Sequence, residues 1–156
     1  MTRSLRERAL ALLARREHAR TELRRKLAPH AESAEEVDAL LDDLARQRLL
    51  SDARYADMRI HVRANRYGNA RLAQELRQQG VSDEIVAATL ADADDELSRA
   101  RAVYAKKFAA PPSTPQERAK QMRFLQTRGF SGEIIRQVMR SLPAAHNECS
   151  TDDDFL

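Results

Sequence analysis

The hydrophobic positions of the first fifty residues recur every three or four residues, which is the spacing of amphipathic helices. Three such stretches are predicted. The first follows Ser4-x-x-Glu7, which has the form of a capping box, and the third opens at Ser33-x-x-Glu36. The second, over residues 19–28, stops near Pro29. Their apolar faces are predicted to comprise Leu5, Ala9, Leu12 and Leu13; Leu23 and Leu27; and Val37, Leu40, Leu41 and Leu44.

The same order of helices is predicted for the next fifty residues. Ser51 caps the first of them, and Gly68-Asn69 breaks the chain before the second. Gly80 is predicted to end the second helix in a left-handed conformation with positive φ, and Ser82 caps the third. The apolar faces are predicted to comprise Tyr55, Met58 and Val62; Leu72 and Leu76; and Ile85, Val86 and Leu90.

A third set of helices follows, with one linker-like stretch at residues 109–113. Thr114 and Pro115 restart the chain as a helix, since proline suits the first helical position. Gly129 repeats the turn predicted at Gly80, and no strand is predicted anywhere. The apolar faces are predicted to comprise Leu97, Val103, Tyr104 and Phe108, and then Ile134, Ile135, Val138 and Met139.

One phrase recurs at a distance of 49 residues: Leu76-Arg77-Gln78-Gln79-Gly80-Val81-Ser82 aligns without a gap with Leu125-Gln126-Thr127-Arg128-Gly129-Phe130-Ser131. A period of this size marks a tandem repeat protein. The sequence therefore predicts an all-α fold of three tandem three-helix repeats, each like a helix-turn-helix unit, in an elongated, curved stack. The predicted boundaries are 1–49, 50–96 and 97–142, followed by an acidic, disordered tail at 143–156.

Composition fits a helical protein of the cytoplasm. Hydrophobic residues make up 42% of the chain, which is enough for a core, while glycine and aromatic residues are scarce. The single cysteine, Cys149, excludes a disulfide framework and a cysteine-rich zinc site. No apolar run approaches the roughly 20 residues that span a bilayer. We therefore expect a soluble, cytoplasmic monomer without a membrane partner.

Catalytic chemistry is not predicted. The four histidines, at positions 18, 30, 61 and 146, fall in different elements, and no glycine-rich nucleotide-binding phrase occurs. His18 is predicted to sit at a helix end as a C-terminal charge. The acidic pairs Asp42-Asp43 and Asp94-Asp95 are adjacent in sequence, so each pair diverges by about 100° on a helix. We predict no catalytic residue, no metal site and no cofactor.

Charge alternates in blocks that the net value of +3 conceals. Residues 1–28, 59–80 and 99–140 carry +6, +4 and +8, whereas residues 29–58, 81–98 and 141–156 carry −5, −6 and −4. Stacking the repeats in register would place the basic helices in a positive stripe, which attracts polyanions or acidic proteins. The alternative is that these are solvated faces with ordinary intramolecular pairs, such as Glu75 with Arg71.

Candidate contact residues lie in the second and third repeats. Segment 59–80 has five arginines and one acidic residue, which predicts little local neutralisation and a larger role than that of the first repeat. Tyr55 and Tyr104 have repeat-related positions, 49 residues apart, and core packing is favoured for them over base stacking. Arg128 has an alternative role in neutralising a helix dipole. The candidates are Arg63, Arg66, Arg71, Arg77, Lys106, Lys107, Arg123 and Arg128.

Five phrases occur in order along the chain: Leu12-Leu13-Ala14-Arg15-Arg16-Glu17-His18, Glu22-Leu23-x-x-Lys26-Leu27, Leu50-Ser51-Asp52-x-Arg54-Tyr55-Ala56, Tyr67-Gly68-x-x-Arg71-Leu72-x-x-Glu75-Leu76-x-x-x-Gly80, and Arg123-Phe124-Leu125-x-x-Arg128-Gly129-Phe130. Together they resemble the RecX family of bacterial regulators of the RecA recombinase, over roughly residues 5 to 142. Two positions depart from the family pattern. Ala19 stands where a capping serine is usual, and Ala31 stands at the glycine position of the first repeat, so that turn must differ.

The resemblance implies a regulatory protein that binds the RecA–DNA filament and inhibits RecA activity or filament extension in DNA repair, recombination and the SOS response. The implied partner is the RecA filament, and direct contact with single- or double-stranded DNA is left open. The alternative is a basic helical DNA-binding module that acts without RecA.

Overall fold

The computed structural model describes residues 2–143, and within that range every regular element is helical. The predicted acidic tail, with His146 and Cys149, lies outside the described residues apart from Pro143. The all-α prediction is confirmed. The elements are α1 (Leu5–Arg15), α2 (Arg20–Leu27), η1 (Ala28–His30, a 3-10 turn), α3 (Ala34–Arg46), α4 (Asp52–Arg63), α5 (Asn69–Gln78), α6 (Asp83–Asp92), α7 (Glu96–Lys107), α8 (Pro115–Thr127) and α9 (Gly132–Ser141).

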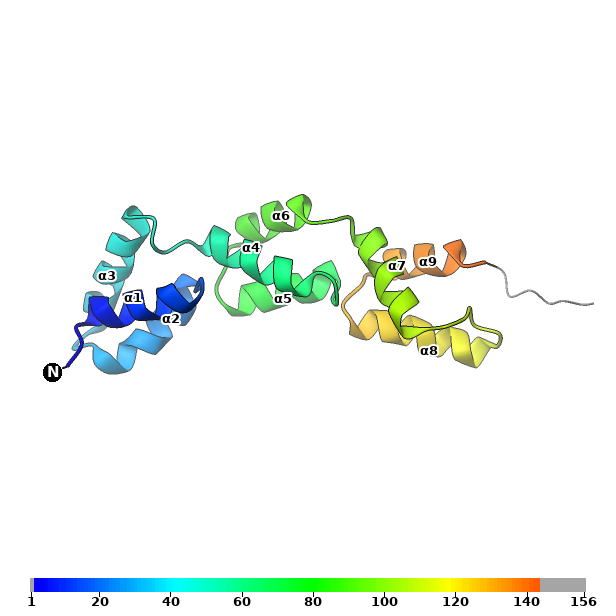
Figure 1. Ribbon diagram of the computed structural model, residues 1–156, viewed down its shortest axis with the longest axis horizontal. Helices are drawn as coiled ribbons and strands as arrows, with labels where there is room; N and C mark the ends of the chain where they lie inside the picture. Colours follow the sequence, from blue (N-terminus) through cyan, green and yellow to red (C-terminus); the bar gives the residue numbers. More distant parts are fainter. Residues whose placement is uncertain (1, 144–156) are drawn as a thin grey trace, which may run out of the picture.

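The helices form three groups of three arranged in a row, which gives the molecule an elongated shape (Figure 1). We call them the first (α1–α3), second (α4–α6) and third (α7–α9) repeats. Each repeat buries its own apolar cluster, because three amphipathic helices can cover one another's stripes. Leu23 and Leu41 are central to the first cluster, Leu76 to the second and Leu125 to the third.

Short polar side chains start most of the helices, as the sequence predicted. Ser4 forms a complete capping box with Glu7, since each accepts a hydrogen bond from the other's backbone N–H. Ser33 accepts from Glu36 N, but the Glu36 carboxylate accepts from Glu32 N instead of completing a box. Single caps of the same kind are made by Ser51, Ser82, Asp95, Thr114 and Ser131.

Two glycines end the second helices of the later repeats, as predicted. Gly80 has φ of 78° and Gly129 has φ of 90°. The following residue returns a hydrogen bond to the helix, from Val81 N to Leu76 O at 3.1 Å and from Phe130 N to Leu125 O at 3.2 Å. In the first repeat the turn differs, as predicted from Ala31, because η1 replaces the left-handed residue.

Gly80→Ala should lower the free energy of unfolding by about 1–2 kcal/mol, because a Cβ strains this φ and would overlap the Thr21 side chain of the first repeat. Gly132→Ala is the matched control. Gly132 lies at the first position of α9, has no positive φ and faces only the flexible end of Arg136, so the change should stabilise the protein by about 0.4–1 kcal/mol. Urea unfolding of both variants measures the difference, and equal effects would contradict the assigned turn.

An acidic side chain of the second repeat and one of the third each cap the second helix of the repeat before. Asp52 Oδ1 accepts from Arg20 N at 2.8 Å, and Glu96 Oε1 accepts from Asn69 N at 3.1 Å. Ala19 needs no capping side chain of its own because the second repeat supplies the acceptor. Ala19 is also fully buried in the apolar cluster of the second repeat. The departure from the family pattern at Ala19 therefore lies at a junction between repeats.

Two predictions about the first helices of the repeats were wrong. Val62 is 60% exposed, and Ile60 faces the core in its place. Tyr55 and Tyr104 are both buried, as favoured, but they are not equivalent positions. Helices α4 and α7 begin at Asp52 and Glu96, which are 44 residues apart instead of 49. The difference arises because the α7–α8 connection is longer than the α4–α5 connection, and because α8 begins earlier than a 49-residue step from the start of α5. The fourth residue of α7, matching Tyr55 in α4, is therefore Arg99.

The prediction that His18 is a helix C-terminal charge was also wrong. His18 lies in the connection between α1 and α2 and is only 2% exposed. Its Nδ1 donates to Arg16 O at 3.0 Å, and its Nε2 accepts from Lys26 Nζ at 3.2 Å. Burial lowers the pKa of His18, and the neighbouring cations Arg16 and Lys26 lower it further. The ring is therefore a neutral structural link.

Candidate functional site

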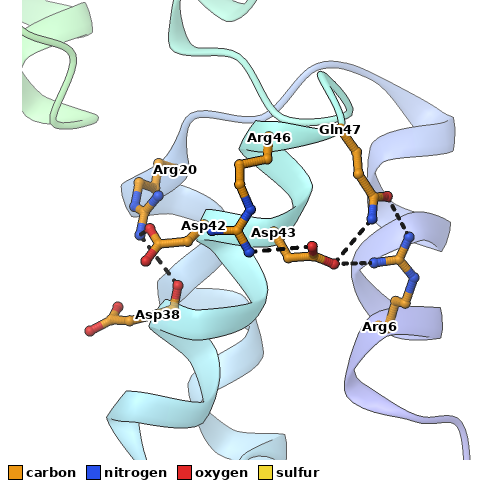
Figure 2. Close-up of polar contacts among 7 residues, drawn as sticks. All are labelled: Arg6, Arg20, Asp38, Asp42, Asp43, Arg46 and Gln47. Carbon is orange, nitrogen blue, oxygen red and sulfur yellow. Dashed lines mark hydrogen bonds and ion pairs between the residues drawn. The ribbon is translucent and has the colours of Figure 1, made fainter.

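Three basic side chains of the first repeat pair with the acidic face of α3. Figure 2 shows Arg6 on α1 and Arg20 on α2 directed towards carboxylates on that helix. Arg6 pairs with Asp43 at 3.0 Å, and Arg20 pairs with Asp42 at 2.6 Å. The acidic block of the sequence therefore faces the basic block that precedes it. Part of the net charge of +6 on residues 1–28 is therefore paired within the first repeat.

Three arginines of the second repeat lie around one carboxylate. Glu75 on α5 lies 2.6 Å from Arg63, 3.5 Å from Arg71 and 3.9 Å from Arg59. The bond to Arg63 is bidentate, and it raises the pKa of that guanidinium. Three arginines on two helices thus share one carboxylate. One carboxylate cancels only one of their three charges, so the segment keeps a positive surplus, although the guanidinium groups themselves are held in ion pairs.

Cations also gather around two half-buried aromatic rings at the boundary of the second and third repeats. The guanidinium carbons of Arg71, Arg63 and Arg128 lie 4.0, 4.5 and 5.4 Å from the Tyr67 ring centroid. Arg128 lies 5.1 Å from the centroid of Phe124, and Lys107 Nζ lies 5.7 Å from it. Cations are attracted to the faces of such rings and are held there without a carboxylate. The sequence analysis did not single out either ring.

Next to these rings lies a groove of about 280 Å³, which we call the junction groove. No carboxylate lines it. Its cations, Arg66, Lys106, Lys107 and Arg128, make no ion pair with any residue between 2 and 143, in contrast to Arg63 and Arg71. They are the accessible positive charge at this boundary. The groove is lined by Asn65, Arg66, Val103, Lys106, Lys107, Phe124 and Arg128.

The structure brings most of the candidate residues to this boundary. Arg63, Arg71 and Arg128 meet at Tyr67, while Arg66, Lys106, Lys107 and Arg128 line the junction groove. Two candidates lie apart from it. Arg77, in the last turn of α5, pairs with Asp83 at 2.8 Å, and Arg123 is exposed on α8 without lining the groove.

A buried arginine that the sequence analysis missed holds the two repeats in register. Arg99 is 6% exposed, and its guanidinium donates to Ala64 O at 3.0 Å, to Tyr67 O at 2.8 Å and to Asn69 Oδ1. Its Nε donates to Asp94 O at 3.0 Å. Burial lowers the pKa of Arg99, although nearby carboxylates oppose this effect. The one signal in the sequence was that Arg99, the fourth residue of α7, stands where α4 has the core residue Tyr55.

Backbone contacts complete the junction. Gly68 N donates to Arg128 O at 2.8 Å, and Ala70 N donates to Gly129 O at 3.2 Å. A Cβ on Gly68 would overlap the backbone of Gly129, so the two turns require the absence of a side chain to pack this closely. These contacts hold the start of α5 at the end of α8 and set the position of Arg128 relative to Tyr67.

Within residues 2–143 no group of three or more histidine, cysteine or acidic side chains is placed to hold a metal ion. No described helix is long and apolar enough to cross a membrane. Cations on a rigid, partly apolar surface suit contact with phosphates or with an acidic protein face.

The fold and the groove define the class: an all-helical protein of tandem three-helix repeats. Two family models match it, described as the second three-helix domain of RecX over residues 51–90 and the third over residues 94–139. Curated relatives called "Regulatory protein RecX" are 48% identical in Ralstonia nicotianae, covering 90% of this chain and 89% of the relative, and 50% identical in Ralstonia pickettii, covering 97% and 94%. The chain belongs to the RecX family of regulatory proteins.

Solved structures agree with this fold. The crystal structure of RecX from Lactobacillus salivarius superimposes with a TM-score of 0.77 at 21% identity, covering 87% of this chain and 92% of that one. At that level of identity the likeness concerns the fold alone. The arrangement of three helical repeats is therefore shared although most side chains differ.

Proposed function

We propose that this protein regulates the RecA recombinase by binding the RecA–DNA filament and inhibiting its activity or extension. The family resemblance supplies the partner, and the junction groove is the observation that supports a binding surface for it. The groove's unpaired cations suit the phosphates of bound DNA or an acidic face of the filament. We further propose that the protein acts in the cytoplasm and without catalysing a reaction.

The elongated shape suits a helical polymer as a partner. A row of three rigid repeats reaches farther than a globule of the same mass, so it can contact neighbouring subunits of a filament (Figure 1). Binding to the assembled filament shifts its growth by mass action, and no covalent step is needed. The unpaired cations and apolar side chains of the junction groove favour the second and third repeats as the main contact.

The protein should inhibit the DNA-dependent ATP hydrolysis of RecA when it is added at a small fraction of the RecA concentration. Inhibition at such a ratio indicates action at filament ends, because few ends exist for many subunits. The measurement is the steady-state ATPase rate with increasing amounts of the protein. An unchanged rate at every ratio would remove the RecA assignment and favour the DNA-binding module that acts alone.

Salt dependence separates the two functions. Binding to bare duplex DNA through phosphates alone weakens with a log–log slope of about −0.9 per phosphate neutralised. Binding to the filament depends in addition on RecA and its nucleotide at fixed salt. Fluorescence anisotropy of a labelled oligonucleotide, with and without RecA, distinguishes these outcomes.

A further inference from the structure

The junction groove combines two kinds of surface. Arg66, Lys106 and Lys107 supply positive charge without a carboxylate partner in residues 2–143, and Phe124 and Val103 supply apolar area beside it. The groove cations differ in this respect from Arg24, which pairs with Asp38 at 3.1 Å. The groove therefore suits a ligand that carries several negative charges together with an apolar side chain.

The chain carries a segment with that composition directly after the described residues. Residues 144–156 contain four acidic side chains and no lysine or arginine. Three of the acidic residues, Asp152, Asp153 and Asp154, are consecutive, and Phe155 and Leu156 follow them. A charge of −4 next to an aromatic and an aliphatic residue complements both surfaces of the groove.

The segment also starts close enough to reach the groove. Pro143 and Ser141 line a surface pocket together with Tyr104 and Ala105 of α7. Lys107 lies within one helical turn of Tyr104, which is about 5 Å along the axis. Between Pro143 and Asp152 there are nine residue steps, which span up to about 30 Å when extended. The pocket and the groove lie on opposite sides of α7, and half the circumference of a helix about 10–12 Å wide is about 16–19 Å, so an extended segment of this length can pass from one to the other. Tethering gives an effective concentration of about the millimolar range.

We propose that the acidic segment 148–156 binds the junction groove of its own chain and competes there with the filament. The competition rests on the proposed function, whereas the intramolecular contact does not. Each exposed charge pair contributes little and is screened by salt, so the contact should be partial and reversible. The segment would then raise the concentration needed for inhibition by about threefold to tenfold, and less at high salt.

The test uses the full chain in two variants with equal changes of net charge. The tail variant carries Glu148→Gln, Asp152→Asn, Asp153→Asn and Asp154→Asn. The control carries Glu35→Gln, Asp57→Asn, Glu84→Gln and Asp92→Asn, four exposed positions that make no ion pair in the described part of the chain. Because the net charge of each variant rises by four, a general increase in attraction to DNA affects both variants equally.

The first measurement needs no RecA. In heteronuclear NMR spectra at low salt, the tail variant should shift the resonances of Lys106, Lys107 and Phe124 relative to the unmodified protein, and the control should not. Adding a peptide of residues 144–156 to the tail variant should restore the shifts. Unchanged groove resonances would overturn the proposal, as would shifts confined to the pocket at Tyr104.

The second measurement is inhibition of the RecA ATPase. The tail variant should inhibit at a threefold to tenfold lower concentration than the unmodified protein, and the control should change this concentration less than twofold. Equal gains by both variants would overturn the competition. Groove shifts without inhibition of RecA by any variant would instead overturn the proposed function and leave the intramolecular contact intact.

Discussion

Reversing Arg66, Lys106 and Lys107 to glutamate should weaken inhibition of the RecA ATPase by roughly tenfold to hundredfold. These three cations line the junction groove and make no ion pair in residues 2–143, so their charge is available to a partner. Reversal also adds repulsion, because like charges facing one another across an interface cost several kcal/mol. The readout is the concentration that halves the ATPase rate.

The fold should survive this change. All three side chains are exposed, and such substitutions usually change stability by about 0.5 kcal/mol or less. A triple reversal of Arg63, Arg66 and Arg71 would be a poorer test. Reversing Arg63 and Arg71 would remove two cations that hold Glu75 and place like charges beside it. Circular dichroism and the melting temperature check that the chosen variant is folded.

The matched control reverses Arg3, Arg8 and Arg15 in the first repeat. These cations also make no ion pair within the described chain and line a surface pocket together. The net charge changes by the same amount, so a general loss of attraction to the filament affects both variants. If the two variants lose inhibition equally, or the first-repeat variant loses more, the junction groove is not the main contact.

Replacing Arg99 with methionine should lower the free energy of unfolding by about 3–5 kcal/mol. Methionine fills a similar volume but donates no hydrogen bond, which leaves the partly buried acceptors at Ala64, Tyr67 and Asn69 without their donor. Each orphaned group costs about 1–3 kcal/mol. For a protein of this size the melting temperature should fall by about 2–4 °C per kcal/mol.

Arg101→Met is the control for this change. Arg101 lies on the same helix, is exposed and makes no ion pair among the described residues, so its replacement should change stability by about 0.5 kcal/mol or less. Arg99→Met should also loosen the second and third repeats from one another. Hydrogen exchange should then increase at Gly68 N and Ala70 N, which bond across the junction. Equal stability of the two variants would contradict the structural role of Arg99.

The candidate site could be predicted only in part. Charge blocks pointed to the second and third repeats, and Lys106, Lys107 and Arg128 do lie at their boundary. The same reasoning treated Arg63 as free charge, although it makes a bidentate pair with Glu75. Net charge by segment counts residues without regard to distance. Whether a cation is paired depends on a carboxylate on another helix, and the docking of helices decides that.

The sequence by itself determined the local elements. Helix starts at Ser4 and Ser82 and turns at Gly80 and Gly129 depend on interactions within a few residues, so short phrases predict them. The 49-residue period likewise determined the order of the three repeats. Even the altered turn at Ala31 followed from one residue, because an alanine strongly disfavours the left-handed conformation that glycine accepts.

Only the tertiary structure decided how the repeats join and which charges remain free. The burial of Ala19 and His18, the anchoring of Arg99 and the close backbone approach at Gly68 all involve a neighbouring element that no local pattern identifies. The contact energies at these positions depend on the distance between segments far apart in the chain. For the same reason the junction groove, with Arg66 and Lys106 brought to one surface, exists only once α7 and α8 pack beside the end of α4.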